Sequence, residues 1–236
     1  MAEALDARLL SELLGLLAHD LRNPLSALHS NVGFLNSVLR DIDNDTREAL
    51  SDTLVSCDGL ASIIDNLELL SQSLIGARGG ATAPVNLHPI VAQGVRRSEA
   101  LAKSHGMRLA LGEEQEGQLL VQSNREMLEL AFGNLLRNAI QHGAPSAPVC
   151  VRIERRGPEA VVRVEDAGQP VDPDLSDEVF SAAGQVRCKG MSSGRYGRGL
   201  GLFCARVAAA AAGARVAAVA SPSASGNVFE LVVGLA

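Results

Sequence analysis

Residues 10–39 read LSELLGLLAHDLRNPLSALHSNVGFLNSVL, and the spacing of their leucines predicts one long amphipathic helix. Apolar residues recur at alternating steps of three and four, the pattern of a heptad seam, with one irregular step beside Pro24. After a short polar break, a second seam of the same kind runs through residues 50–74. Asp45, with Glu48 three positions later, has the signature of the start of this second helix.

Two seamed helices joined by a short turn predict an antiparallel hairpin. A hairpin alone leaves part of its apolar stripe exposed, whereas two hairpins can close a four-helix bundle. We therefore expect a homodimer. On the heptads alone, a plain coiled-coil dimerisation module explains this segment equally well.

The stretch GARGGATAP, residues 76–84, marks a change of pattern. Beyond it, segments with helical periodicity are mixed with segments of alternating or continuous apolar residues, which predicts a layered α/β sandwich. The expected helices lie near residues 89–104, 125–142 and 200–212, and the expected strands near 107–111, 119–122, 149–153, 161–164, 214–220 and 228–233.

Composition excludes several classes of function. The 236 residues carry a net charge of −6, no tryptophan and only 3% aromatic residues, which argues against a nucleic-acid partner. The four cysteines lie far apart, so neither a zinc site nor a disulfide framework is indicated. No signal peptide or membrane-spanning run is recognisable, and we expect a cytoplasmic protein without membrane insertion.

The segment AHDLRNPL, residues 18–25, contains the first residues suited to chemistry. His19 lies two positions from seam leucines on either side, which places it about 160–200° round the helix from them and away from the bundle core. Asp20 can hold the imidazole and fix its tautomer. Asn23, one turn along, can position a water or a phosphoryl group. Taken alone, the pattern favours a solvated surface histidine.

Two polar motifs follow in the second part of the chain. Asn134 and Asn138 share one face of an apolar helix, and neutral oxygen ligands suit Mg²⁺ held together with nucleotide phosphates. Surface or capping asparagines are the commoner explanation of such a pair. Asp166 ends an apolar strand before Gly168, where it can accept a hydrogen bond from an exocyclic amine; a turn aspartate explains it equally well.

The last motif is GRYGRGLGL, residues 194–202. Its glycines allow the backbone to approach a phosphate closely, and the helix that follows offers N–H groups at its N-terminus. The motif does not follow a strand, and an acidic ribose partner at the right distance is missing. A dinucleotide-binding turn is therefore disfavoured.

Together and in this order, the motifs resemble those of the sensor histidine kinases of two-component systems. They are His-Asp-x-x-Asn-Pro on a hairpin, Asn-x-x-x-Asn, Asp-x-Gly and Gly-x-Gly-Leu-Gly-Leu. The resemblance covers nearly the whole chain and implies an α+β protein. Residues 1–79 would form the dimerisation and phosphoacceptor domain, a four-helix bundle in the dimer. Residues 80–236 would form the catalytic ATP-binding domain, an α/β sandwich of the histidine kinase and gyrase type.

The resemblance also implies roles for single residues. His19 would be the phosphorylated nucleophile, with Asp20 as its acid–base partner, and Asn23 would position water in the reverse, phosphatase direction. Asn138 would coordinate Mg²⁺, and Asp166 would bind the adenine amine. The ATP-binding residues would be Asn134, Asn138, Asp166, Gly168, Gly197, Gly199, Leu200 and Gly201.

The chain departs from the family pattern around its ATP lid, which would run from about residue 167 to 198. Pro170 stands where the family has the second glycine of Asp-x-Gly-x-Gly, which stiffens the hinge. Gln141 and His142 replace a lysine and an aromatic residue, and Phe180, in the place of the family's lid phenylalanine, lacks a second phenylalanine after it. Candidates to supply positive charge at the phosphates are Arg187, Lys189, Arg195 and Arg198.

The resemblance thus implies a histidine autokinase that uses ATP and Mg²⁺. The phosphoryl group on His19 would pass to an aspartate of a response-regulator receiver domain, docked on a face with Arg22, Leu25 and Leu28. The input would come from a separate sensor protein or from a segment outside this chain. Two alternatives remain open: a histidine phosphotransfer protein with a degenerate ATP-binding-like domain, and a non-enzymatic dimeric scaffold that binds nucleotide.

Overall fold

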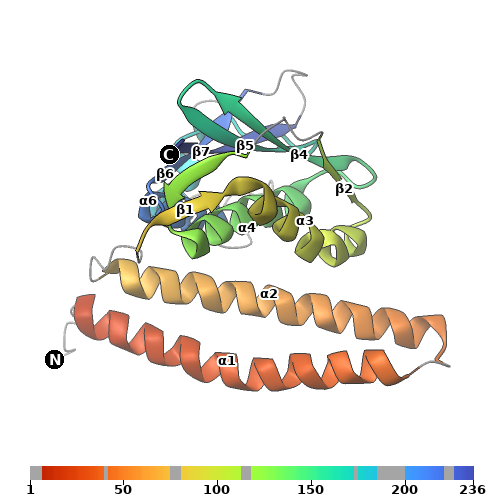
Figure 1. Cartoon of the computed structure of the whole chain (residues 1–236). Helices are drawn as coiled ribbons and strands as arrows, with labels where there is room; N and C mark the ends of the chain where they lie inside the picture. The colour runs from red at the N-terminus through yellow and green to blue at the C-terminus, as the bar shows by residue number, and fades with distance from the viewer. Residues whose placement is uncertain are drawn as a thin grey trace. The chain divides into compact units, whose positions relative to one another are not determined.

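The chain forms two compact units, Met1–Arg78 and Gly79–Ala236. The first contains α1 (Ala7–Val38) and α2 (Asn44–Leu74), which pack side by side in opposite directions (Figure 1). This is the hairpin that the two leucine seams predict. Neither these helices nor any other in the described ranges combines the length and the apolar character needed to span a bilayer. The computed structural model describes residues 7–39, 42–74, 81–112, 118–172, 175–184, 200–220 and 226–236.

The second helix of the hairpin begins one residue after its capping side chain, Asp43. The Oδ1 atom of Asp43 accepts a hydrogen bond of 2.7 Å from the backbone N–H of Thr46. This N–H and the hydroxyl of Thr46 lower the pKa of Asp43, because both stabilise the ionised carboxylate. The prediction that Asp45 caps the helix is therefore wrong by two positions, and Asp45 lies in the first helical turn.

The hairpin core consists of residues seven positions apart on each helix. Ala18 and Leu25 of α1 meet Cys57 and Ile64 of α2 in one buried cluster. A small residue, Ala18, and a large one, Leu25, thus alternate on the face of α1 that packs against α2.

A buried pair of serines holds one end of the same interface. The Ser11 hydroxyl donates to the carbonyl oxygen of Ser71 at 2.7 Å, and the Ser71 hydroxyl donates to the carbonyl oxygen of Ser11 at 2.8 Å. Each hydroxyl thus finds an acceptor on the opposite helix, so neither serine is buried without a hydrogen bond.

Only part of the predicted leucine seam faces this core. Leu17, Leu21 and Leu28 are exposed, although Leu25 in the same seam is buried. At about 100° per residue, the exposed apolar residues of α1 gather in a second stripe beside the buried one. The seam predicted as one stripe is therefore two. The exposed apolar residues of the hairpin are Leu9, Leu13, Leu16, Leu17, Leu21, Leu28, Phe34, Leu35, Val38, Leu39, Leu60, Ile63 and Leu74.

The second unit is a sheet of five strands with helices on one face (Figure 1). The strand order is β2-β4-β5-β7-β6, in which β2 is parallel to β4 and the other neighbours are antiparallel. The strands are β2 (Arg108–Leu111), β4 (Pro148–Arg156), β5 (Glu159–Asp166), β6 (Ala214–Val219) and β7 (Asn227–Gly234), and the helices are α3 (Leu87–Ser104), α4 (Arg125–His142) and α6 (Gly201–Ala211).

Smaller elements accompany the sheet and its helices in the described part of this unit. A separate two-stranded sheet pairs β1 (Ala83–Asn86) with β3 (Leu120–Ser123), and the 3₁₀ helix η2 (Glu178–Phe180) follows β5. The sequence pattern predicts β3 but neither β1, a four-residue strand containing Pro84, nor η2. The layered α/β architecture is confirmed. Most of the helix and strand ends lie within two residues of their predicted positions.

The helices and the sheet bury a continuous apolar core. It includes Leu135 and Leu136 of α4, Val162 of β5 and Phe229 of β7, each at most 1% exposed. On the other face of the sheet, Arg156 donates to both carboxylate oxygens of Glu230 at 3.0 and 2.8 Å. Charged side chains thus cover the apolar residues of that face with their stems.

The pairing of β5 with β7 requires glycine at position 226, immediately before β7. Gly226 has φ +81°, in the region that disfavours residues with a side chain. A Cβ atom there would overlap the carbonyl oxygen of Asp166, the last residue of β5. The start of β7 can therefore approach Asp166 only because residue 226 has no side chain.

We expect Gly226→Ala to lower the free energy of unfolding of the second unit by about 3 kcal/mol, because strain at positive φ adds to the overlap with the backbone of Asp166. The matched control is Gly157→Ala: Gly157 has φ +61°, but no heavy atom of the described residues lies within 4 Å of a Cβ there. This control should cost about 1 kcal/mol. Calorimetric unfolding of the whole chain measures both, and equal losses would contradict the role of the close approach.

Candidate functional site

His19 lies midway along α1 and points into solvent. Its side chain is 73% exposed, and α1 continues without interruption through Pro24. At about 100° per residue His19 lies outside the buried stripe and about 160–200° round the helix from Leu17 and Leu21 of the exposed one. The hairpin therefore presents this imidazole to any large reactant that approaches from solvent.

The neighbouring carboxylate lies next to one of the two ring nitrogens. Nδ1 of His19 is 3.4 Å from Oδ1 of Asp20, at the long end of the hydrogen-bond range. A carboxylate on this side favours the tautomer with the proton on Nδ1, which leaves the lone pair of Nε2 available for attack. The arrangement suits a nucleophilic histidine whose Nε2 faces away from its carboxylate.

Arg22 links the two helices one turn after His19. Its guanidinium donates to Oδ1 of Asp65 at 2.7 Å and to Oε2 of Glu68 at 2.8 Å, both on α2. The hydrogen bond to Glu68 is the main reason why the pKa of Arg22 is raised, and Asp65 adds to it. Arg22 thus stays charged and fixes the position of α1 relative to α2 near His19.

The predicted docking face around His19 needs one correction. Leu25 is only 8% exposed and belongs to the core of the hairpin, because it lies seven positions from Ala18 on the buried stripe. Leu28 is exposed, and Asn23 is exposed one turn from His19. The accessible surface near the histidine is therefore polar, with leucines only on its flank.

In the second unit, α4 carries the two predicted asparagines. Asn134 is buried and its Nδ2 donates to the carbonyl oxygen of Leu130 at 3.0 Å. Asn138 is half-buried, and its Nδ2 atom has no hydrogen-bond partner among the described residues. Buried amide groups normally find partners, so Asn138 has unused capacity to bind a polar ligand.

The N-terminus of α6 lies against the same stretch of α4. A Cβ atom at Gly201 would be 3.5 Å from Oδ1 of Asn134, an ordinary contact distance. Leu200 precedes α6 and supplies no side-chain hydrogen bond to its N–H groups, whereas Asn86 and Asn124 cap α3 and α4 in this way. At its N-cap position α6 thus has no side-chain hydrogen bond to its first N–H groups, which lie beside the asparagines of α4.

Asp166 is the last residue of β5 and is 5% exposed. Its Oδ1 accepts hydrogen bonds from the backbone N–H of Gly168 at 2.8 Å and from Nδ2 of Asn227 at 3.0 Å. The sequence pattern predicts this strand end and the turn at Gly168, but not Asn227. No motif within β7 signals that contact, because it depends on the register between two strands.

The remaining predicted site residues divide into two groups. Phe180 is buried and packs edge-to-face on Phe229, with ring centroids 6.2 Å apart, and Gln141 and His142 are half-buried at the end of α4. The other residues lie outside the described part of the chain, so their positions are not assigned: Gly197, Gly199, Arg187, Lys189, Arg195 and Arg198.

The donor set fits a magnesium ion that is bound mainly through a nucleotide. No group of three or more His, Cys, Asp or Glu side chains suited to a metal occurs among the described residues. The Nδ2 of Asn138, which has no partner among the described residues, is a hydrogen-bond donor suited to a phosphate oxygen. The amide Oδ1 of the same side chain is the atom that could serve as a single neutral ligand for the ion. Mg²⁺ commonly keeps several waters and takes one or two protein ligands together with phosphate oxygens.

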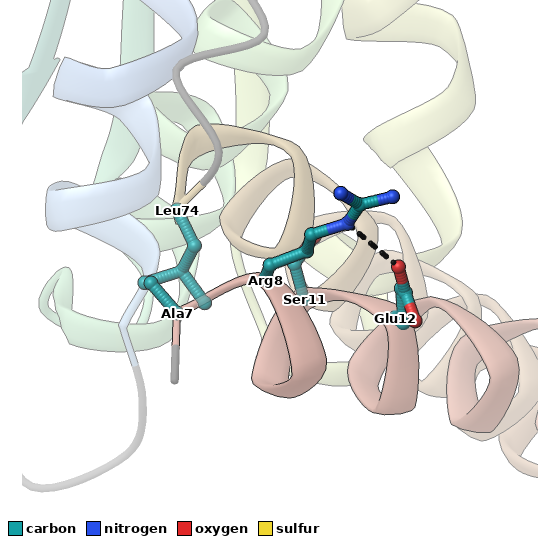
Figure 2. Close-up of a pocket in the computed structure, with 5 residues that line it drawn as sticks. All are labelled: Ala7, Arg8, Ser11, Glu12 and Leu74. Atoms are coloured by element: carbon teal, nitrogen blue, oxygen red, sulfur yellow. Dashed lines mark hydrogen bonds and ion pairs between the residues drawn. The ribbon is translucent and has the colours of Figure 1, made fainter. Parts of the chain in front are cut away.

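The hairpin has a pocket of about 580 Å³ that lies away from the predicted site residues (Figure 2). It is lined by Ala7, Arg8, Ser11, Glu12 and Leu74, and Arg8 forms an ion pair with Glu12 at 3.2 Å. None of the predicted site residues lines it. The pocket therefore does not contribute to the constellation around His19.

Two family models match the chain, one for each unit. Residues 9–74 match the His Kinase A (phospho-acceptor) domain, and residues 123–236 match the histidine kinase-, DNA gyrase B-, and HSP90-like ATPase. His19 lies within the first match, and Asn134, Asn138 and Asp166 lie within the second.

Curated relatives align with both units together. The chain is 25% identical over 227 residues to the sensor protein KdpD of Clostridium acetobutylicum and 26% identical over 231 residues to the alginate biosynthesis sensor protein KinB of Pseudomonas aeruginosa. These alignments cover 94% and 95% of this chain. They cover 24% and 37% of the relatives, so the chain spans well under half of their length.

Among solved structures, full-length ShkA in complex with AMPPNP has a similar fold. The TM-score is 0.61 at 21% sequence identity, and the match covers 95% of this chain and 46% of ShkA. At this identity the likeness shows the fold: a helical hairpin followed by an α/β domain of the ATPase type.

Proposed function

This chain belongs to the sensor histidine kinases of two-component systems, and we propose that it phosphorylates itself on His19 at the expense of ATP. The observation that carries the proposal is the exposed His19, whose Nδ1 lies beside Asp20, on a hairpin followed by an α/β unit with Asn138 and Asp166. The phosphoryl group then passes to an aspartate of a response-regulator receiver domain. Such a protein acts in the cytoplasm, where ATP and receiver domains are found.

In the proposed reaction, Nε2 of His19 attacks the γ-phosphorus of ATP. The new N–P bond forms as the bond between this phosphorus and the β,γ-bridging oxygen breaks, and ADP leaves with that electron pair. The attack leaves a positive charge on the ring, and Asp20 removes this charge by accepting the proton from Nδ1. The reaction requires the nucleotide held by the second unit to reach the histidine of the first.

The residues of the second unit bind and orient the nucleotide. Asp166, buried at the end of β5, accepts a hydrogen bond from the exocyclic amine of adenine. Asn138 and Asn134 face the phosphates, and a magnesium ion bound at Asn138 would neutralise their charge. The N–H groups at the start of α6 donate to phosphate oxygens in the same way.

Asn23 serves the phosphatase reaction in this proposal, the hydrolysis of the phosphorylated receiver domain. It is exposed one helical turn from His19, where its amide can orient a water towards a phosphorylated receiver aspartate. Arg22, tied to Asp65 and Glu68, keeps this part of α1 in place during both reactions.

Incubation of the whole chain with γ-labelled Mg·ATP should give label that is acid-labile and base-stable, as expected of a phosphorylated histidine. His19→Gln should abolish it because the nucleophile is gone. Asn138→Ala should lower the initial rate by at least about tenfold, since a ligand for the charged phosphates is lost.

The matched control for this experiment is His29→Gln. His29 is another exposed histidine of α1, with Nε2 3.3 Å from Oδ1 of Asp58. Its loss should leave the label unchanged. Label that survives in His19→Gln, or that disappears equally in both variants, would contradict the assignment of His19.

We further propose that the hairpin forms a homodimer through its exposed apolar stripe. Ile63 on α2 is 63% exposed and Leu16 on α1 is 62% exposed. Single exposed apolar residues are common on monomers, but so many on one hairpin indicate an interaction surface. Two copies of the hairpin that bury this stripe against each other form a four-helix bundle. His19 lies about 160–200° round the helix from Leu17 and Leu21 of this stripe, so it stays accessible in such a bundle.

We expect Ile63→Lys to weaken dimerisation by more than about tenfold, because an ammonium group would be buried in the bundle. Gln72→Lys is the matched control: Gln72 is exposed on α2 nine positions later, about 180° round the helix from Ile63. Analytical ultracentrifugation over a concentration series measures both variants. A wild-type chain that sediments as a monomer at micromolar concentration would disprove the dimer.

A further inference from the structure

The side chain of Asn227, at the start of β7, lies among three polar groups of the turn that follows β5. Its Nδ2 donates to Oδ1 of Asp166 at 3.0 Å and to the carbonyl oxygen of Gln169 at 3.1 Å. Its Oδ1 accepts from the backbone N–H of Val171 at 2.7 Å. Asn227 is 5% exposed and its bond to Asp166 is buried, whereas its bonds to Gln169 and Val171 are partly buried.

Asn227 bridges the turn on both sides of Pro170. The carbonyl oxygen of Gln169 precedes the proline and the N–H of Val171 follows it, and both bind the same amide. Proline has no N–H of its own and fixes φ near −65°, so the turn cannot supply a backbone donor at position 170. The amide of Asn227 provides these hydrogen bonds from β7 instead.

The same amide fixes the carboxylate of Asp166. Oδ1 of Asp166 accepts from the backbone N–H of Gly168 at 2.8 Å as well as from Asn227. Two donors on one oxygen define both the rotation and the plane of the carboxylate. The direction of the other oxygen, Oδ2, is thereby determined by groups outside Asp166.

Few other side chains could make this set of bonds. The site needs a donor towards Asp166 and an acceptor towards Val171 from one short side chain, and an amide provides both. Aspartate at position 227 would set two carboxylates against each other, and alanine would leave both polar groups of the turn without their partner.

We propose that Asn227 is a positioning residue for base recognition: it orients the carboxylate of Asp166 towards the exocyclic amine of adenine. This inference rests on the proposed function, in which Asp166 accepts that amine. Asn227 would therefore affect the selectivity for adenine over other bases, and not the affinity for the triphosphate group.

The test compares the dissociation constants of ATP and ITP for the whole chain by calorimetry. Inosine has a carbonyl oxygen where adenine has the amine, so the ratio of the two constants reports the contact with Asp166. We expect the wild type to prefer ATP by at least tenfold. Asn227→Ala and Asn227→Asp should reduce this ratio to below threefold while ITP binds within threefold of the wild-type value.

Two further variants separate positioning from a general structural role. Asp166→Ala should abolish the preference, and adding Asn227→Ala to it should change the ratio no further. Asn86→Ala is the matched control, because Asn86 also makes a side-chain bond to a backbone N–H, at the start of α3, but does not contact Asp166. The control should keep the wild-type ratio.

The outcomes distinguish this inference from the function on which it rests. If Asn227→Ala weakens ATP and ITP by the same factor, or leaves the ratio unchanged, the positioning role is wrong while the kinase proposal stands. Retained binding of ITP shows that a variant is folded; if the alanine variant binds neither nucleotide, the Asn227→Asp variant decides. If the wild type binds neither, the proposed function fails and this inference fails with it.

Discussion

The register between β5 and β7 determines which side chains meet at Asp166, the residue proposed to bind adenine. Eight residue pairs join the two strands, from Glu159 with Gly234 to Asp166 with Asn227. Because side chains alternate between the two faces of a sheet, a slip of one residue would move every side chain of β7 to the opposite face. Phe229 would leave the core, and Asn227 would no longer meet Asp166.

In the hairpin, the comparable constraint is the division of apolar residues between two stripes of one helix. Ala18 and Leu25 bury one stripe against α2, while Leu17 and Leu28 remain on the other. The two stripes lie at different angles round the helix axis, so one can pack on α2 while the other remains free for a second interface. His19 belongs to neither stripe, so the helix can be packed on two sides and still expose its imidazole.

The sequence predicts those features that depend on local pattern. The bounds of α4 agree with the prediction, and Asp166 lies at a strand end before Gly168, because helical periodicity and a glycine turn are both encoded within a few residues. The cap of α2 is predicted wrongly, because the spacing to Glu48 favours Asp45 whereas Asp43 accepts the hydrogen bond from Thr46.

Long-range features could not be predicted in this way. Leu25 and Leu28 are equivalent in a heptad pattern, and only the packing of α2 distinguishes the buried one from the exposed one. The contact between Asp166 and Asn227 joins residues 61 positions apart. It follows from strand register, which neither residue type nor local spacing indicates.

Pro170 stands where the family motif has a glycine, and the hydrogen bonds of Asn227 to both neighbours of Pro170 compensate for this difference. Considered alone, a proline in place of a glycine removes a backbone donor and restricts a hinge. In the fold, the amide from β7 satisfies the backbone on both sides of that proline and holds Asp166 at the same time. The restriction also lowers the entropy of the unfolded chain, which favours the folded turn. Proline at position 170 would weaken a flexible turn. It is compatible with this turn, which is rigid because its hydrogen bonds come from Asn227 on another strand.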